Sequence, residues 1–303
     1  MKTKIIRDPN ALTGGADAAI AVVEEEGGTT LASCSLWMDG ETGALGHFTA
    51  SGEAPAALLF EAAEEQLRGA GCQSVVGPMD GNTWHSYRLV TKSDGRAPFL
   101  LEPQNPPDWP RYFRATGWQS LARYTSSEID LSVEAASAAI DRVARRLSSG
   151  GVTIRHLEPE DFEQELQRIY DVSIVSFQDN FLYSPISFEE FATMYQKVKP
   201  LLVPELSLLA EDRRSRPVGF VFALPEPSAP RETVVVKTLA VLPERRFAGL
   251  GSLLVERVHH AAREMGFDRA IHALQHQDNS STKISSRHEA KVFREYTLYE
   301  KHL

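Results

Sequence analysis

One stretch, residues 233–273, limits what this chain can fold into more than any other. It begins TVVVKTLAV, a β-branched and apolar run that is typical of a buried strand. Pro243 ends that strand because proline cannot donate to a sheet ladder. Apolar residues then recur at the helical period from Leu250 to Met265, and Gly266 stops the helix. The pattern predicts a strand, a tight turn, an amphipathic helix and a second strand.

The turn between this strand and helix carries Arg246, Gly249 and Gly251 in the order R-x-x-G-x-G. The first amides of a helix have no partner within the helix, and they point outward at the positive end of the helix dipole. Glycines in the turn let an anion approach that backbone closely. The stretch therefore predicts a site for a phosphate-bearing ligand, unless the glycines serve the turn alone.

The same stretch resembles the acyl-CoA-binding motif of the GNAT superfamily of acyltransferases, whose signature is [Q/R]-x-x-G-x-[G/A] between a strand and a helix. The L-A-V-x-P lead-in, the turn and the amphipathic helix all follow in the family's order. A Rossmann dinucleotide site is disfavoured because G-x-G-x-x-G is absent. The resemblance implies that acyl-CoA is bound by the residues at these positions: Leu239, Ala240, Val241, Arg246, Phe247, Ala248, Gly249, Leu250, Gly251 and Ser252.

Charge and cysteine content narrow the class of protein. The net charge of −9 argues against a nucleic-acid partner or an acidic membrane surface. Residues 1–130 hold 10 basic and 17 acidic side chains, and the rest hold 22 and 24, so a polyanionic cofactor should prefer the second half. The two cysteines, Cys34 and Cys72, have no metal-ligand spacing, and no signal peptide or membrane-spanning run is evident. We expect a cytoplasmic protein without a metal.

The first half repeats the order of elements seen around the motif. Three strands, a helix and a further strand are expected at these positions: Ala18–Val23, Leu31–Trp37, about 45–50, from about Pro55 to Gly69, and 74–77. Aligning Gly71 with Gly266 without gaps sets three residues, Ser51, Ala54 and Ala56, opposite the arginine and two glycines of the motif. We interpret residues 1–131 as a degenerate GNAT-like domain that lacks the opening strand, the first helices and the anion site.

The remaining organisation follows from one helical segment. Residues 132–150 predict a linking helix and a boundary, because SVEAASAAIDRVARRL has helical spacing and SSGG follows it. Residues 151–303 are then the intact GNAT domain. The expected fold class is α/β (α+β), with two GNAT-like domains that each hold a mixed, mostly antiparallel sheet flanked by helices.

The loop at residues 178–187 is a candidate for acceptor contact. In GNAT enzymes the loop between the first two helices forms one wall of the acceptor pocket, which makes Asn180, Phe181 and Tyr183 candidate substrate residues. The alternative is a loop with buried aromatic rings and a serine cap, and the sequence supports both interpretations equally.

The residues after Ala273 depart from the family pattern N-x-x-A-x-x-L-Y-x-x-x-G-F. Asn279 matches the asparagine that flanks CoA, but Ser286 stands where the family has a tyrosine that protonates the departing thiolate. A serine hydroxyl is a far weaker acid than a phenol. Ser286 and Tyr296 are the candidate catalytic residues, with Tyr183 or a water as other donors. His272 or His276 is a possible base.

The function expected from this resemblance is N-acetyl transfer from acetyl-CoA, the co-substrate, to a primary amine of a small molecule or a protein. Neither nucleic acid nor membrane is expected as a partner, and the protein is expected to be a monomer or a homodimer. The alternative is an acyl-CoA-binding sensor or interaction protein without turnover, which the missing tyrosine favours.

Overall fold

The computed structural model describes residues 1–6, 14–24, 27–38, 40–133, 138–229, 232–278, 284–285 and 288–303. These residues divide into two compact units. Unit 1 comprises residues 1–98, 103–124 and 294–303, and unit 2 comprises residues 99–102 and 125–293. The sequence placed divisions at 131 and 150 instead. The difference at the C-terminus arises because strand β13 (Lys291–His302) pairs with strands of unit 1, a non-local contact that no local pattern announces.

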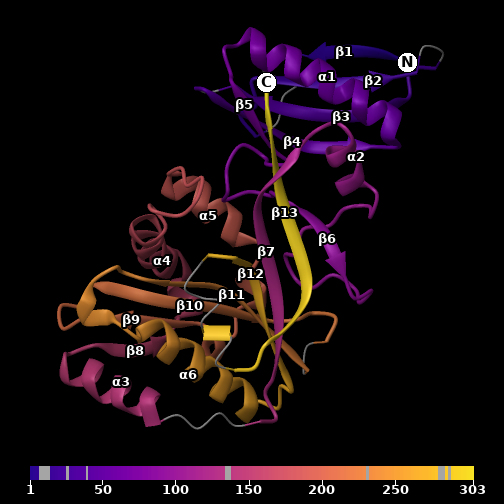
Figure 1. The fold of residues 1–303 in the computed structure, drawn as a ribbon. Helices are drawn as coiled ribbons and strands as arrows, with labels where there is room; N and C mark the ends of the chain where they lie inside the picture. The colour runs from indigo at the N-terminus through magenta and orange to yellow at the C-terminus, as the bar shows by residue number, and fades with distance from the viewer. Residues whose placement is uncertain are drawn as a thin grey trace. The chain divides into compact units, whose positions relative to one another are not determined.

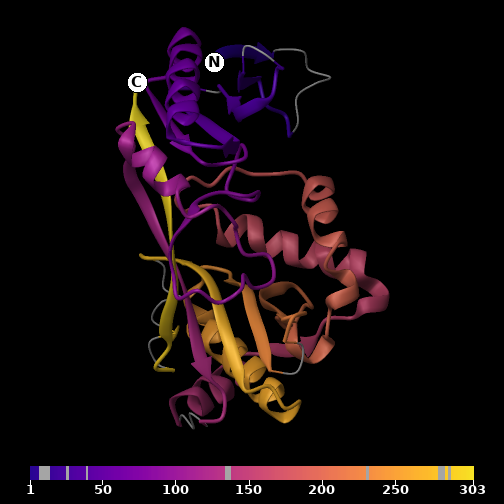
Figure 2. The ribbon, with the colours of Figure 1, turned by 90° about the vertical axis from the view of Figure 1, so that its right-hand side faces the viewer.

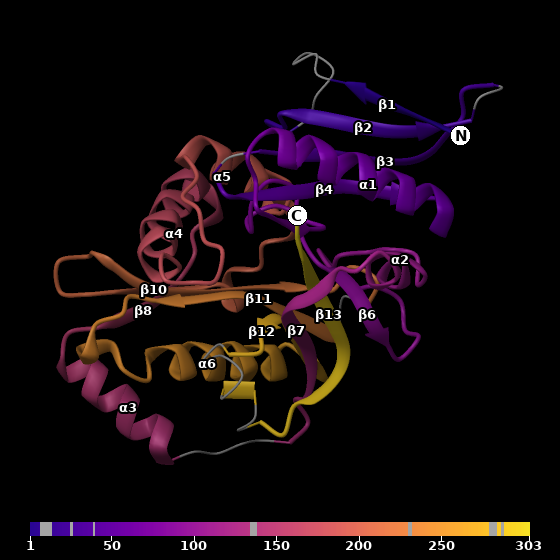
Figure 3. The same ribbon diagram turned by 45° about the horizontal axis from the view of Figure 1, so that its top comes forward.

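Unit 1 is built on a mostly antiparallel sheet (Figure 3). Its strand order is β1-β2-β3-β4-β5-β13, with β6 also paired to β13. The pair β4/β5 is parallel and the other pairs are antiparallel. Besides β13, the strands of this unit are β1 (Lys2–Ile6), β2 (Ala18–Val23), β3 (Thr30–Trp37), β4 (Thr42–Ala50), β5 (Ser74–Gly77) and β6 (Leu89–Ser93). The opening strand that the sequence analysis expected to be missing is present as β1.

Helix α1 (Glu53–Gly69) covers the strands β2, β3 and β4 (Figure 2). Apolar residues recur every three or four positions along it, so one face is buried in the sheet. An aromatic cluster joins α1 to the short helix α2 (Trp109–Ala115): the ring of Phe60 lies 5.3 Å from that of Phe48 and 4.8 Å from that of Phe113. The four tryptophans of the chain all belong to unit 1: Trp37, Trp84, Trp109 and Trp118.

The strands of unit 2 follow the order β12-β11-β10-β9-β8, with the unit 2 residues of β7 beside β12. Strands β11 and β12 are parallel, and the pairs from β8 to β11 are antiparallel. The strand bounds are β7 (Gln119–Asp130), β8 (Thr153–His156), β9 (Leu208–Glu211), β10 (Pro217–Pro225), β11 (Thr233–Val241) and β12 (Arg269–His276).

Helices cover both faces of this sheet, with α4 and α5 on one side and α6 and α3 on the other (Figure 1). All residues of β10 from Val218 to Leu224 are buried, as expected of a strand covered on both faces. Within the described residues no helix is long and apolar enough to cross a bilayer. The helical bounds are α3 (Ala138–Ser149), α4 (Phe162–Ser176), α5 (Phe188–Gln196) and α6 (Leu250–Glu264), with 3-10 turns at Pro159–Asp161, Lys199–Leu201, Pro204–Leu206 and Arg245–Phe247.

Helix α3 differs from the linking helix that the sequence predicted. It belongs to unit 2 and packs against α6. Val143 of α3 lies so close to the turn before α6 that a Cβ atom at Gly249 would come within 3.1 Å of its methyl groups. The segment therefore supports the turn rather than serving as a spacer.

Candidate functional site

The candidate site lies where two parallel strands separate. Pairing between β11 and β12 runs from Thr233 opposite Arg269 to Val236 opposite His272, and it ends there. On its other side β11 stays paired to β10 as far as Val241, with a register shift after Val236. Residues 237–241 therefore have no strand neighbour from β12, and a cavity of about 760 Å³ opens beside them.

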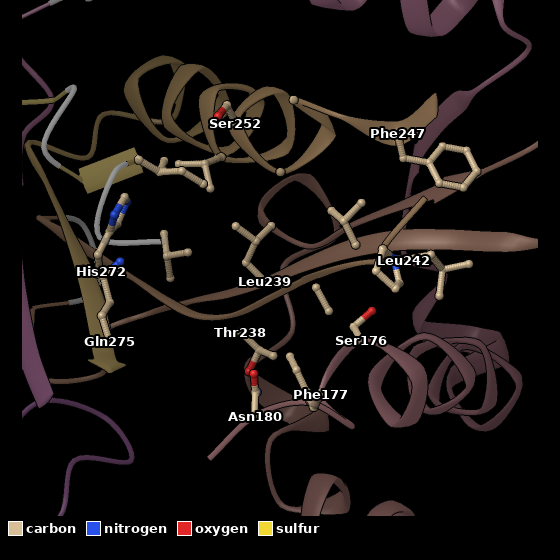
Figure 4. A pocket seen from close by; sticks show the side chains of 18 of the residues that line it. Ser176, Phe177, Asn180, Thr238, Leu239, Leu242, Phe247, Ser252, His272 and Gln275 are labelled. Atoms are coloured by element: carbon tan, nitrogen blue, oxygen red, sulfur yellow. The ribbon is translucent and has the colours of Figure 1, made fainter. Parts of the chain in front are cut away.

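Strands, helices and the turn before α6 all contribute to the walls of the cavity (Figure 4). Ser252 lies on the α6 side, and Thr238 and Asn180 lie on the opposite side. His272 and Gln275 of β12 form one end, and Leu242 and Phe247 form the other. The lining residues expected from the motif are Leu239, Ala240, Val241, Phe247, Ala248, Gly249, Gly251 and Ser252.

The turn into α6 has the backbone geometry of an anion site. Gly249 caps the helix with a left-handed backbone, φ 82°. The amide of Leu253 donates to the carbonyl of Gly249 at 3.1 Å, so the amides of Leu250 and Gly251 precede the first intrahelical hydrogen bond. A Cβ atom at Gly251 would lie 3.4 Å from Leu239 Cδ2, which leaves room for a methyl group and little more. A negatively charged group fits at this end of the helix.

Arg146 of α3 holds the same turn from behind. Its guanidinium donates to the carbonyl of Arg246 at 3.0 Å and also to the carbonyl of Ala248. This contact fixes two carbonyls of the turn and sets a positive charge beside it. No local pattern in the sequence indicates this role, because Arg146 and its partners are about a hundred positions apart.

Arg246 and Leu250 do not line the cavity among the described residues, although the motif implied both. Leu250 is fully buried in the core. The Arg246 Nε atom donates to Glu244 Oε2 at 2.8 Å, and its guanidinium lies 4.5 Å from the centroid of the Phe247 ring. Hydrogen bonds from Arg216 and then Arg246 hold the pKa of Glu244 below its usual value. The charge of Arg246 is thus largely balanced within the protein.

Only one of the three residues expected to contact the acceptor lines the cavity. Asn180 lines the cavity, whereas Phe181 and Tyr183 do not. The Phe181 ring is 42% exposed and lies 5.9 Å from the ring of His276. The Tyr183 hydroxyl donates to the Ile174 carbonyl at 3.3 Å. Two residues at the end of α4 that the sequence analysis missed, Ser176 and Phe177, line the cavity instead.

Of the two expected catalytic residues the structure describes only Tyr296, and it does not line the cavity. Tyr296 belongs to unit 1, is fully buried and is absent from the cavity lining. Ser286 and Asn279 lie outside the described residues. No tyrosine is among the described lining residues, but the hydroxyl of Tyr195 on α5 is hydrogen-bonded to Thr238, which does line the cavity. Burial raises the pKa of Tyr195, so its phenol stays protonated.

His272 is poorly suited to act as a base, although it lines the cavity. Its Nδ1 atom lies 2.8 Å from Ser285 Oγ and its Nε2 atom lies 3.0 Å from His259 Nε2, so both ring nitrogens are occupied. Burial, followed by the nearby His288, lowers the pKa of His272 to about 3. The ring is therefore neutral at pH 7 and is a weak base.

Comparison with known proteins agrees with this geometry. A model of the acetyltransferase (GNAT) family matches residues 160–283. Protein YghO of Escherichia coli strain K12 is 23% identical over 280 residues, which cover 82% of this chain and 70% of that protein. A protein named bacterial ceramide synthase, from Caulobacter vibrioides, is 25% identical over 170 residues. That match covers 55% of this chain and 44% of the relative, so the chain spans less than half of it.

Solved structures share the fold across nearly the whole chain. A GCN5-related N-acetyltransferase from Sphaerobacter thermophilus matches with a TM-score of 0.54 at 15% identity, over 94% of this chain and 80% of that one. A tandem GNAT protein from the clavulanic acid biosynthesis pathway matches with a TM-score of 0.53 at 11% identity, over 99% and 83%. At these identities the likeness shows the fold alone.

Proposed function

We propose, from the premise that residues 160–283 are a domain of the acetyltransferase (GNAT) family, that the chain is an N-acyltransferase that moves an acyl group from acyl-CoA to a primary amine. Acetyl-CoA is the proposed donor. The observation that carries the proposal is the end of β11/β12 pairing at Val236, which leaves a strand edge beside the N-terminus of α6.

The proposed donor is held by backbone rather than by side chains. The pyrophosphate of CoA binds the first amides of α6, where the helix dipole favours negative charge. The pantetheine arm lies along residues 237–241 and hydrogen-bonds to them as an added strand. An amide of that strand then polarises the thioester carbonyl and stabilises the oxyanion of the tetrahedral intermediate.

The proposed reaction is direct attack of the amine on the thioester carbon. The new C–N bond forms, the C–S bond breaks, and the amine proton leaves to a water. The thiolate takes its proton from water or from Tyr195 through Thr238. An enzyme thiol is not required: both cysteines are buried in unit 1, and burial raises the pKa of each. Positioning of the two reactants supplies much of the rate.

The test is to incubate the protein with acetyl-CoA and a panel of primary amines while free thiol is followed. Amine-dependent thiol release above the rate without protein supports the proposal. The Gly251→Val variant, which fills the cavity beside Leu239, is expected to abolish the release. Calorimetric binding of acetyl-CoA without thiol release for any amine would instead support the alternative, a sensor without turnover.

The ceramide synthase relative favours a second candidate within the same reaction class. A ceramide is the amide of a fatty acid and a long-chain amino alcohol, so its formation is also N-acylation. The cavity of about 760 Å³ has apolar walls from Leu239, Val255 and Ile284. A series of acyl-CoA donors from two to sixteen carbons, each with a short amine and with a long-chain amino alcohol, separates the two. Higher kcat/KM for the long pair would replace acetyl-CoA as the proposed donor.

A further inference from the structure

A chain of buried polar groups runs inward from the candidate acyl-transfer cavity. Gln275 lines that cavity, and its Oε1 atom accepts a hydrogen bond from Ser285 Oγ at 2.9 Å. Ser285 Oγ lies 2.8 Å from His272 Nδ1, and His272 Nε2 lies 3.0 Å from His259 Nε2. All four residues are buried, and His259 and His288 line a second cavity of about 650 Å³.

The direction of these hydrogen bonds assigns the tautomers of the histidines. Ser285 gives its one proton to Gln275, so it accepts from His272 Nδ1–H. The Nε2 atom of the neutral His272 ring then carries a lone pair and accepts from His259 Nε2–H. In the neutral ring of His259 the donating Nε2 atom carries the proton. The remaining nitrogen, His259 Nδ1, is left with a lone pair.

The Nδ1 atom of His259 has no hydrogen-bond partner within the described structure. The side chain has no surface exposed to bulk solvent, although it lines the second cavity. A buried acceptor without a partner costs free energy, and a bound ion or an ordered water is one way in which such an atom is satisfied. A neutral imidazole nitrogen with an available lone pair is the commonest metal ligand in proteins.

Two further ligand groups lie beside His259. Glu256 precedes His259 by three positions on α6, so the two project from the same helix face. His288 follows from the segment before β13, and one ligand atom from each of the three residues lies within 4.8 Å of the others. Glu256 Oε2 and His288 Nε2 are 3.8 Å apart, too far for a good hydrogen bond. Two ligand atoms on a tetrahedral zinc ion are about 3.4 Å apart, so no pair of the three ligand atoms needs to close by more than about 1.4 Å.

We propose that Glu256, His259 and His288 bind a divalent transition-metal ion of the zinc class. The two-histidine, one-carboxylate set suits such an ion, and the second cavity gives it an entry path and an open coordination position. This departs from the expectation of no metal that the sequence supported.

The surrounding groups match those of a metal site. A metal-bound imidazole usually donates its other N–H to a fixed acceptor, which orients the ring. His259 does so through His272, Ser285 and Gln275, and that chain ends in the wall of the acyl-transfer cavity. Arg263 lies 3.4 Å from Glu256 Oε1, which leaves Oε2 for the ion.

The test uses the full chain, stripped with a chelator and titrated with zinc chloride in a calorimeter. One zinc ion per chain is expected, and cobalt chloride should give the visible absorption of a tetrahedral complex. His288→Ala and Glu256→Gln are each expected to weaken zinc binding by on the order of 100-fold. Circular dichroism checks that each variant stays folded.

A matched control is available on the same helix. His260 and Glu264 form an exposed pair at 3.7 Å, so His260→Ala and Glu264→Gln should leave zinc affinity unchanged. Absence of zinc binding to the wild-type chain would overturn the proposal, as would unchanged affinity in His288→Ala or equal loss in the control variants. The proposal does not rest on acyl transfer, and CoA binding measured in the same variants tests that function separately.

Discussion

Helices α1 and α6 end in the same way in the two units. The backbone hydrogen bonds Ala70 to Gln66, Gly71 to Arg68 and Cys72 to Leu67 recur 195 positions later as Met265 to Ala261, Gly266 to Arg263 and Phe267 to Ala262. Both glycines have a left-handed backbone, with φ 93° at Gly71 and 87° at Gly266. Each helix also leads into a strand that is parallel to the one before it.

The two helices differ where they begin. Two residues, Ser51 and Gly52, join β4 to α1, whereas eight residues, 242–249, join β11 to α6. The gapless alignment that set Ser51, Ala54 and Ala56 opposite the motif therefore holds for the helix ends and fails in the turn. The turn before α1 is too short to surround an anion, so the two turns differ in backbone length as well as in side-chain chemistry.

A second difference lies at one buried helix position. Glu64 of α1 corresponds, by the same offset of 195, to His259 of α6. The chain itself neutralises Glu64, through Lys301 Nζ at 2.6 Å and Arg68 at 3.3 Å. His259 is neutral and keeps a nitrogen without a partner in the described structure. The first position is closed by an ion pair, and the second is open to a ligand.

The largest effect is expected on the stability of unit 1, when the ion pair of α1 is broken. Lys301→Met leaves the carboxylate of Glu64 buried with Arg68 alone, which should lower the free energy of unfolding of unit 1 by about 3 kcal/mol. All four tryptophans lie in unit 1, so urea unfolding followed by tryptophan fluorescence reports on this unit. Adding Glu64→Leu should recover most of the loss. Unchanged unfolding in Lys301→Met would show that the pair contributes nothing.

The next effect tests the turn of α6. Gly251→Val should weaken CoA binding on the order of 100-fold, because the added methyl groups occupy the space beside Leu239 and Val241. Gly249 is a poorer choice, since its φ of 82° and its contact with Val143 make any side chain disturb the fold as well. Calorimetry with CoA measures the loss, and His260→Val on the exposed face is the control. Wild-type affinity in Gly251→Val would remove the turn from the proposed site.

A smaller effect on CoA affinity is expected when Arg146, which supports the turn, is replaced. Arg146→Ala removes the hydrogen bonds to the carbonyls of Arg246 and Ala248, and CoA affinity should fall about fivefold, a cost of about 1 kcal/mol. The adjacent exposed Arg145→Ala changes the net charge equally and serves as the control. Equal losses of CoA affinity in the two variants would mean that Arg146 acts through its charge and not through its hydrogen bonds to the turn.

No change in CoA affinity is expected for substitutions at the start of α1. Ser51→Ala and Ala54→Ser alter the start of α1, where the short turn offers no anion site, so CoA affinity should not change. The measured stoichiometry should be one CoA per chain. Two CoA per chain, or weaker binding in either variant, would contradict the contrast between the two units.

The sequence by itself determined the elements whose signals are local. The β-branched, apolar run of β11, the apolar face of α6 and the glycines at 71 and 266 depend on residues within a few positions, so their patterns predicted strand, helix and stop. The motif at 246–251 predicted an anion-binding turn at the start of α6, and Phe247, Ala248, Gly249 and Gly251 line the cavity. Strand β1 was missed because five residues, KTKII, carry little periodicity.

Only the tertiary structure decided what these elements bring together. The pairing of β11 with β12 ends at Val236 for reasons that lie in the packing of the sheet. The hydrogen bonds of Arg146 to the turn, and those that link Gln275 to His259, join residues from different parts of the sequence. Such contacts depend on how sheets and helices pack, and no local propensity encodes them. The proposed ligand of unit 2 is therefore visible in the sequence, whereas the buried histidines that distinguish its helix from that of unit 1 are visible only in the fold.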